Sequence, residues 1–134
     1  MVKFPSAEWV EKFKDAVNSS KSYAESAKTW EGDFVFEIKA DGALKQDFFI
    51  YIDLYHGQCR KAHVIEDPAS VKTEFVYSGL YSNWLRLLNK EIDPIKGLMT
   101  GKFKLKGNMA KIMRYVKAAK ELVNCTTMVE AEYL

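Results

Sequence analysis

The stretch GLMTGKFKLKGN, residues 97–108, has the composition of a phosphate-binding loop, because its G-x-x-x-G-K spacing brings glycines next to a lysine. Such a loop needs four residues between its glycines and then Lys-Ser/Thr at a helix start, so that backbone amides point at phosphate. Here three residues intervene, Phe103 stands where Ser/Thr is required, and residues 102–106 alternate polar and apolar with the period of a strand. We therefore interpret Gly101 as a helix end and Gly107 as a turn, and expect no nucleotide there.

His56, Cys59 and His63 are the residue types that bind zinc. If Cys59 and His63 lie four residues apart on one strand, about 13 Å separates their Cα atoms. Zinc ligands must come within about 2.0–2.3 Å of one ion, so this spacing does not favour a metal site. We expect neither a metal nor another cofactor.

Catalytic chemistry also lacks candidates in this sequence. There are only two histidines, both in a predicted hairpin, and no serine has the setting of a nucleophile elbow. Asp53 and Arg60 are more simply a cross-strand ion pair. The sequence therefore predicts no enzyme activity.

Length and composition predict one domain spanning residues 1–134. The chain is 48% hydrophobic and 28% charged, which is typical of a globular protein with a core of its own. Two cysteines do not form a disulfide framework, and we expect reduced thiols in the cytoplasm. No signal-peptide core, peroxisomal tripeptide or run of ~18 apolar residues is present.

The charge of the chain is unevenly distributed. Residues 102–120 carry seven lysine or arginine side chains and no acidic one, whereas the whole chain has a net charge of +2. This basic pole predicts either a plain solvated face or a weak contact with an anionic membrane through the C-terminal helix. Nucleic acid is not expected as a partner, because no aromatic residues alternate with the lysines on the same face.

Residues 1–30 are predicted to form two helices. Ser6 can cap the first, whose apolar face repeats every three or four residues from Trp9 to Val17. Ser22 and Glu25 have the S-x-x-E spacing of a capping box for the second helix, which Glu31-Gly32 ends.

Four strands are predicted between residues 33 and 79. DFVFEIKA alternates in hydrophobicity, and DFFIYIDLY and QCRKAHVIED flank His56-Gly57, a dipeptide suited to a hairpin turn. KTEFVYSG is the fourth strand, and the register of the hairpin stays open by one residue, so the face that carries Tyr51 and Tyr55 is not decided.

The remaining elements are two helices over residues 82–100, a fifth strand over 102–106 and a long helix over 108–124. Asp93-Pro94 is a typical helix start, and Asn108 can cap the last helix. Consecutive hairpins favour an α+β fold with a five-stranded, mainly antiparallel sheet covered by helices.

Methionine is concentrated near the C-terminus, where four of five methionines lie at positions 99, 109, 113 and 128. Methionine adapts to irregular apolar surfaces, so these residues indicate either an ordinary core or a deformable apolar cavity between helix and sheet.

The segment LMTGKFKLKGNMAKIMRYVKAAK resembles the sterol carrier protein type-two family, most of all in Gly101-Lys102-hydrophobic-Lys104-x-x-Gly107-Asn108-Met109. EFVYSGLYSNWLRLLNKEIDPIKGLMTG resembles the segment that precedes this signature, and the likeness covers about residues 30–123. The resemblance implies an α+β fold with an apolar tunnel for sterols, fatty acids or acyl-CoA. The chain end differs from the targeting tripeptide of peroxisomal members.

From the pattern and the resemblance together we expect a non-enzymatic carrier of a hydrophobic or amphipathic ligand in an apolar tunnel, first of all a fatty acid or fatty acyl-CoA, with a sterol-like ligand as a further option. The alternative is an accessory protein-interaction module whose cavity is vestigial. Oligomeric state is not predicted. The expected cavity lining consists of Trp84, Leu88, Ile95, Leu98, Met99, Phe103, Leu105, Met109, Met113 and Val116.

The anionic end of such a ligand needs positive charge near the cavity. The amides that start the Asn108 helix, with Lys102, Lys104 or Lys106 beside them, are the expected site for a carboxylate or phosphate.

Overall fold

A five-stranded sheet with strand order β4-β3-β2-β5-β6 forms the centre of the computed structural model, which describes residues 1–134. Strands β2 and β5 are parallel, and every other neighbouring pair in this sheet is antiparallel. The predicted α+β fold with a mainly antiparallel sheet is confirmed. The strands are β2 Glu31–Lys39, β3 Phe48–Tyr55, β4 Gln58–Ile65, β5 Phe75–Leu80 and β6 Phe103–Lys106.

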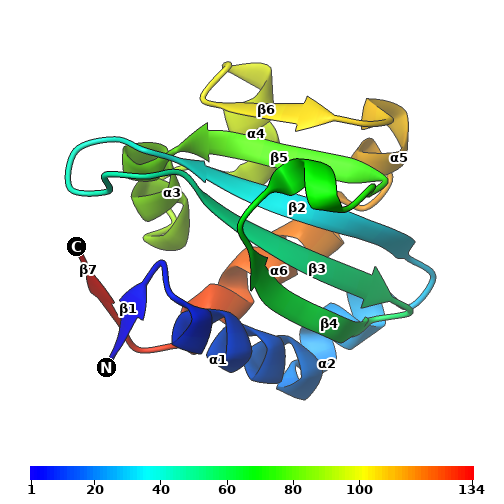
Figure 1. Cartoon of the computed structure of the whole chain (residues 1–134). Helices are drawn as coiled ribbons and strands as arrows, with labels where there is room; N and C mark the ends of the chain where they lie inside the picture. Colours follow the sequence, from blue (N-terminus) through cyan, green and yellow to red (C-terminus); the bar gives the residue numbers. More distant parts are fainter.

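The longer helices lie together along one side of this sheet (Figure 1). Helix α1 begins after Ser6, whose side chain accepts a hydrogen bond from the Trp9 amide at 3.1 Å, as its sequence position predicted. Asp93 caps α4 in the same way, with Pro94 at the first helical position. The helices are α1 Ala7–Ser19, α2 Lys21–Ser26, α3 Tyr81–Leu88, α4 Pro94–Met99, α5 Met109–Met113, α6 Val116–Thr126 and the short 3₁₀ helix η1 Pro68–Ser70.

The predicted capping box of the second helix is wrong. Ser20, not Ser22, caps α2, because its side chain accepts a hydrogen bond from the Tyr23 amide at 3.1 Å. Helix α1 continues to Ser19, so a single residue joins the two helices and Ser22 lies inside α2. Ser20 is buried, and its position between the helices makes it the cap of the second.

Strand alternation decides which residues face the helices. Phe34 and Phe36 on β2 point toward them, and the register pairs these residues with Ile52 and Ile50 of β3. Tyr51 and Asp53 therefore lie on the opposite face, which settles the hairpin register. There Arg60 Nε donates to Asp53 Oδ2 at 3.0 Å, so the predicted cross-strand ion pair is confirmed.

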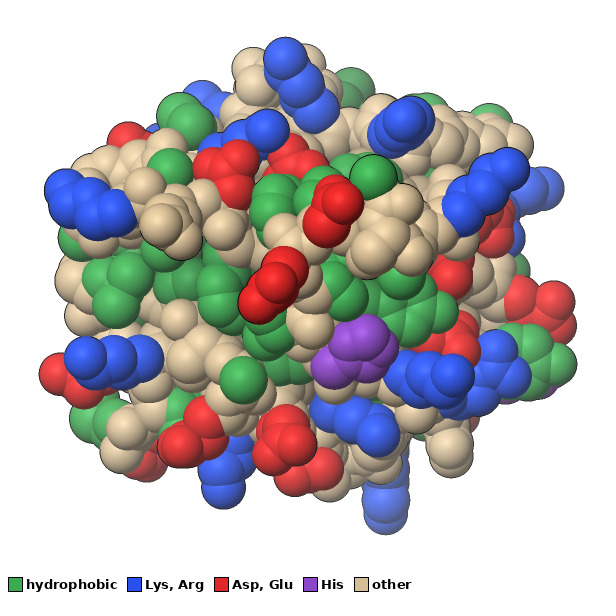
Figure 2. All heavy atoms as spheres, viewed as in Figure 1, with side chains coloured by type: hydrophobic (Ala, Val, Ile, Leu, Met, Phe, Trp, Pro, Cys, Tyr) green, Lys and Arg blue, Asp and Glu red, His purple; other side chains and the backbone are tan.

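The opposite face of the sheet has no layer of long helices over it. Figure 2 shows this face as a mixture of acidic, basic and hydrophobic side chains. Tyr51 donates a hydrogen bond to Asp33 Oδ2 at 3.0 Å, and its ring lies 5.3 Å from that of His63. The buried core therefore lies on the helix-covered side.

The two ends of the chain pair with each other as a small parallel sheet, which sequence analysis did not predict. Strand β1, Val2–Phe4, lies beside β7, Ala131–Tyr133 (Figure 1). Phe4 is buried, and its ring packs edge-on against that of Trp9 at 4.7 Å. This pairing ties the start of α1 to the chain that follows α6.

The long helix predicted over residues 108–124 is two helices. Asn108 does cap α5, as its side chain accepts from the Lys111 amide, but the helix ends at Met113 and α6 starts at Val116. Tyr115 has φ −123° and ψ 36°, outside the helical region. Its ring packs edge-on against Trp30 at 4.9 Å and its hydroxyl lies 3.1 Å from Thr29 Oγ1, so tertiary contacts displace it from the helix.

The glycine-rich stretch joins a helix to a strand. Gly101 follows α4 and leads into β6 rather than into a helix, so no helix N-terminus stands at Lys102. Gly107 has φ +129°, and a Cβ there would collide with the Phe75 ring. The turn between β6 and α5 therefore requires glycine.

Candidate functional site

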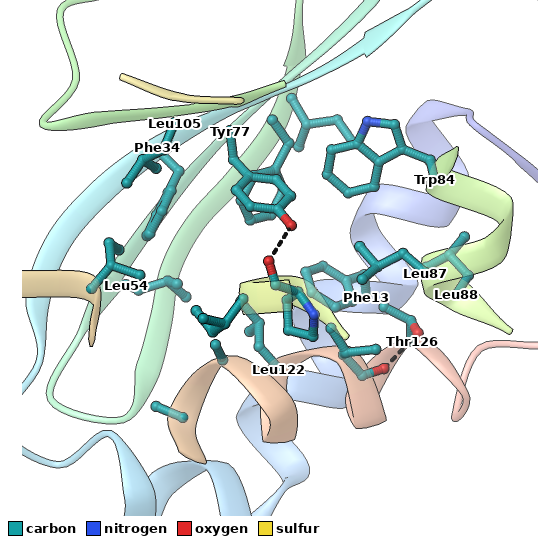
Figure 3. Close-up of a pocket in the computed structure, with 18 of the residues that line it drawn as sticks. Phe13, Phe34, Leu54, Tyr77, Trp84, Leu87, Leu88, Leu105, Leu122 and Thr126 are labelled. Carbon is teal, nitrogen blue, oxygen red and sulfur yellow. Dashed lines mark hydrogen bonds between the residues drawn. The ribbon is translucent and has the colours of Figure 1, made fainter. Parts of the chain in front are cut away.

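A cavity of about 110 Å³ lies between the helix-covered face of the sheet and the helices. Of the 25 residues around it, 23 are hydrophobic. Figure 3 shows Phe34, Leu54, Tyr77 and Leu105 reaching into it from the strands, opposite residues from the helices. A site lined in this way selects a ligand by apolar contact.

The sheet wall of the cavity is largely aromatic. Phe34 and Phe36 come from β2, and Tyr77 from β5 packs its ring 6.4 Å from Phe36. Because these positions alternate along their strands, each strand contributes a side chain every second residue. Ile38, Ile50, Leu54 and Leu105 are the aliphatic residues of this wall.

The helix wall draws on every helix of the chain from α1 to α6. Trp9 and Phe13 of α1 stack at 5.0 Å, and Leu122 of α6 faces them from the C-terminal part of the chain. Helices α1, α3, α4 and α6 each contribute two or more lining residues, whereas α2 and α5 contribute one each. The further lining residues from the helices include Tyr23, Leu87, Pro94, Ile112, Ala118, Ala119, Val123 and Thr126.

Three polar side chains of the cavity wall are hydrogen-bonded to backbone carbonyls of the protein. Tyr77 donates to the Pro94 carbonyl at 2.8 Å, Trp84 Nε1 donates to the Glu37 carbonyl at 3.0 Å, and Thr126 donates to the Val123 carbonyl at 2.6 Å (Figure 3 shows the first and last). Burial raises the pKa of Tyr77, so its hydroxyl stays neutral. The wall thus carries neither a charge nor a poised nucleophile.

Five of the ten residues predicted to line the cavity do so. They come from α3, α4 and β6, and all five have apolar side chains within the cavity wall. They are Trp84, Leu88, Ile95, Leu98 and Leu105.

Phe103 and Val116 are turned toward the core without reaching the cavity. The Phe103 ring stacks on Tyr77 at 4.8 Å and is buried. It packs against Gly79 of β5 and Gly97 of α4, so it lies between α4 and the sheet. Val116 is partly buried against the core at the start of α6.

The three methionines of the prediction lie at the surface. Met99 is 74% exposed, Met109 39% and Met113 44%. The expectation for Met109 and Met113 assumed one continuous helix, and the break at Tyr115 separates their face from that of α6. Met99 ends α4 just before the Thr100 cap and points away from the cavity.

The predicted anion site is not assembled at the cavity. Lys104 and Lys106 alternate with Phe103 and Leu105 on β6, so they lie on the other face of the sheet. Lys102 precedes the strand, and Asn108 uses its side-chain oxygen to cap α5, which has only five residues. The basic group that reaches the rim of the cavity is instead Lys111, which the sequence did not single out.

His56, Cys59 and His63, the residues considered as zinc ligands, have different surroundings and do not converge on one point. His56 pairs with Glu31 at 2.7 Å, while His63 packs beside Tyr51 on the open face of the sheet. Cys59 is buried, and its thiol donates to the Lys61 carbonyl at 3.3 Å. The structure contains no group of three or more His, Cys, Asp and Glu side chains arranged to hold a metal ion.

Most of the lining residues from the first half of the chain were not among the predicted ones. Phe34 and Phe36 were visible as an alternating strand, and the stripe of α1 contained Trp9 and Phe13. Only the pairing of distant elements puts these residues around one cavity. None of the helices is long and apolar enough to span a bilayer.

Comparison with known proteins agrees with this architecture. The profile of the SCP-2 sterol transfer family matches residues 10–120. No curated protein matches the chain.

Solved structures with the same fold cover nearly the whole chain. A crystal structure of sterol carrier protein 2 has 28% identity and a TM-score of 0.87, covering 96% of this chain and 100% of its own. A solution structure from Thermus thermophilus, described as possibly a sterol carrier protein, has 27% identity and a TM-score of 0.88, covering 98% of this chain and 93% of its own.

More distant neighbours share the fold at lower identity. Sterol carrier protein 2 from Yarrowia lipolytica, in its apo form, has 18% identity and a TM-score of 0.61 over 93% of this chain and 96% of its own. The profile match extends over most of the sequence and the fold is the same throughout. The chain therefore belongs to the SCP-2 sterol transfer family.

Proposed function

We propose that this protein is a non-enzymatic carrier of a fatty acid or fatty acyl-CoA, whose hydrocarbon chain occupies the cavity between sheet and helices. The observation that carries the proposal is the lining itself: 23 of its 25 residues are hydrophobic. The polar atoms of Tyr77, Trp84 and Thr126 are bonded within the protein, so a hydrocarbon chain that enters leaves these groups paired.

The energy of burial is sufficient for such a ligand. A chain of about fourteen methylenes contributes about 11 kcal/mol at ~0.8 kcal/mol each. Association costs of about 4 kcal/mol, the low end of their range, leave about 7 kcal/mol. This corresponds to a dissociation constant on the order of 10 µM.

The cavity must enlarge to hold such a chain. Its volume of about 110 Å³ is below the ~150 Å³ of an engineered cavity that holds benzene. Leu98, Leu105 and Leu122 line it and are only partly buried, so they are the side chains best placed to give way. Enlargement of this kind would turn the cavity into the tunnel that the family resemblance implies.

A solved relative supports an acyl ligand. A structure of palmitated sterol carrier protein 2-like 2 from Aedes aegypti shares the fold, with a TM-score of 0.54 at 12% identity. The likeness is one of fold alone, so fatty acid as the ligand of this chain is the proposal.

Cellular context is part of the proposal. The two free, buried thiols, Cys59 and Cys125, suit a reducing compartment such as the cytoplasm. The basic residues 102–120 suit a weak contact with anionic membranes, where a carrier would exchange its ligand.

The competing function is an accessory protein-interaction module with a vestigial cavity. Native mass spectrometry of the purified protein separates the two. A co-purifying lipid, or uptake of added hexadecanoic acid at one molecule per chain, is expected for the carrier. A chain that stays empty at 100 µM hexadecanoic acid rejects the carrier and favours the module.

A further inference from the structure

Lys111 of α5 holds its ammonium group at the rim of the cavity rather than in solvent. Nζ donates to the Glu31 carbonyl at 2.6 Å and to Glu74 Oε2 at 2.8 Å. It also lies over the Trp30 ring, 4.8 Å from the centroid, and the side chain is 24% exposed. A lysine in this position keeps its charge next to an apolar wall.

The surroundings of Lys111 are continuous with the cavity. Trp30 is one of the lining residues, and so are Tyr115 and Ile112, the next residue along α5. The Tyr115 ring meets Trp30 edge-on at 4.9 Å, so Lys111 lies against one lining side chain that itself packs on a second. A group bound at Nζ would therefore be adjacent to the apolar interior.

The present partners of Lys111 leave room for another acceptor. An ammonium group has three donors, and the two hydrogen bonds to Glu31 and Glu74 occupy two of them. The Glu74 side chain is 42% exposed, and ion pairs with partners so open to water hold weakly. Its carboxylate can leave for solvent while the lysine stays against Trp30.

No other basic side chain has this relation to the cavity. The only other cation that lies over an aromatic ring is Arg60, above Tyr55, which is not a lining residue. Lys104 and Lys106 are on the opposite face of the sheet. None of the other basic residues of the 102–120 stretch is a lining residue of the cavity.

We propose that Lys111 binds the acidic head group of the ligand, a carboxylate or a phosphate, which displaces Glu74 from the lysine. The hydrocarbon chain then passes between Trp30, Tyr115 and Ile112 into the cavity. The inference rests on the proposed carrier function and adds to it a preference for acidic over neutral lipids.

The test compares an acidic with a neutral ligand of the same chain. Dissociation constants are measured for hexadecanoic acid, its methyl ester and hexadecanoyl-CoA, each by displacement of a fluorescent probe. The proteins are wild type, Lys111→Met, Glu74→Gln and, as matched control, Lys104→Met on the far face of the sheet. Thermal unfolding establishes that each variant is folded.

Lys111→Met should weaken binding of the acid at least tenfold and change that of the ester less than twofold. Glu74→Gln should strengthen binding of the acid about threefold or more, because it removes the competing carboxylate, and Lys104→Met should change neither. The ligand that loses more affinity in Lys111→Met, acid or acyl-CoA, identifies carboxylate or phosphate as the group bound.

Equal losses for acid and ester in Lys111→Met, or weaker acid binding in Glu74→Gln, would overturn the head-group site while leaving the carrier function intact. If Lys111→Met does not fold, the Glu74→Gln result decides alone. A wild-type protein that binds none of the three ligands rejects the carrier function itself.

Discussion

Cys59 and Cys125 are buried thiols whose ionisation is coupled to folding. Burial raises the pKa of Cys59 to about 12, and the nearby Asp53 carboxylate adds to the effect. Burial also raises the pKa of Cys125. Because the thiols of the unfolded chain ionise near pH 8.5, the unfolded state loses protons that the folded state keeps.

The free energy of unfolding should therefore fall as pH rises above about 8.5. Each thiol whose folded pKa is raised contributes stability that is fully present below the unfolded pKa. This stability is lost by up to about 1.4 kcal/mol per pH unit as pH rises from the unfolded toward the folded pKa. Urea unfolding of wild type, Cys59→Ala and Cys125→Ala from pH 8.5 to 10 measures it. Each variant should show a shallower slope than wild type, and an unchanged slope in Cys59→Ala would contradict the burial of this thiol.

The turn of the β3–β4 hairpin lies against a helix. His56 and Gly57 have φ of 49° and 80°, so the predicted hairpin turn is confirmed. A Cβ at Gly57 would lie 2.6 Å from the Ala24 carbonyl oxygen of α2. The turn is therefore set by its local sequence and also by the helix docked against it.

Replacing Gly57 with alanine separates these two effects. Gly42, in the turn between β2 and β3, also has positive φ, 56°, but a Cβ there would meet no atom within 4 Å. We expect Gly42→Ala to cost about 1–2 kcal/mol of backbone strain. Gly57→Ala should cost at least twice as much in urea unfolding, because α2 must also shift, and equal costs would show that α2 does not constrain the turn.

At the scale of the whole molecule, one cavity lies between two layers and touches nearly every element. The helices come from both ends of the chain, and the pairing of β1 with β7 brings those ends together. The cavity is therefore a property of the assembled layers rather than of any one segment. Its capacity can be altered by one side chain without touching the lysine at its rim.

Ala119 on α6 lines the cavity, and phenylalanine there should fill it. Ala119→Phe is expected to weaken hexadecanoic acid binding more than tenfold, while costing about 1–3 kcal/mol of stability from overpacking. Ala43→Phe, at an exposed turn, adds the same group without effect on binding. Isothermal titration with hexadecanoic acid measures the affinity of both variants. If Ala119→Phe binds the acid as tightly as Ala43→Phe does, the ligand does not occupy this cavity.

Local sequence patterns were sufficient for most elements. The alternation of Phe34, Phe36 and Ile38 identifies a half-buried strand, and Ser6, Asp93 and Asn108 mark helix starts by side-chain capping. These signals are local because the hydrogen bonds and side-chain periods that cause them span only a few residues. The family signature lies in the same elements, whereas the strand order and the parallel pairing of β2 with β5 were not predicted.

Tertiary contacts decided what those patterns left open. Val2–Phe4, at the start of the chain, pairs with Ala131–Tyr133 at its end. Tyr115 packs against Trp30 and lies outside the helical region, although the sequence around Tyr115 favours a continuous helix. The resulting break leaves Met109 and Met113 exposed and brings Lys111 over Trp30. Periodicity determines that a residue lies on an apolar face, and with the family resemblance it was sufficient to predict an apolar cavity and half of its proposed lining. Only packing between distant segments determines what each apolar face meets, which is why the rest of the lining and the place of Lys111 beside Trp30 came from the tertiary structure.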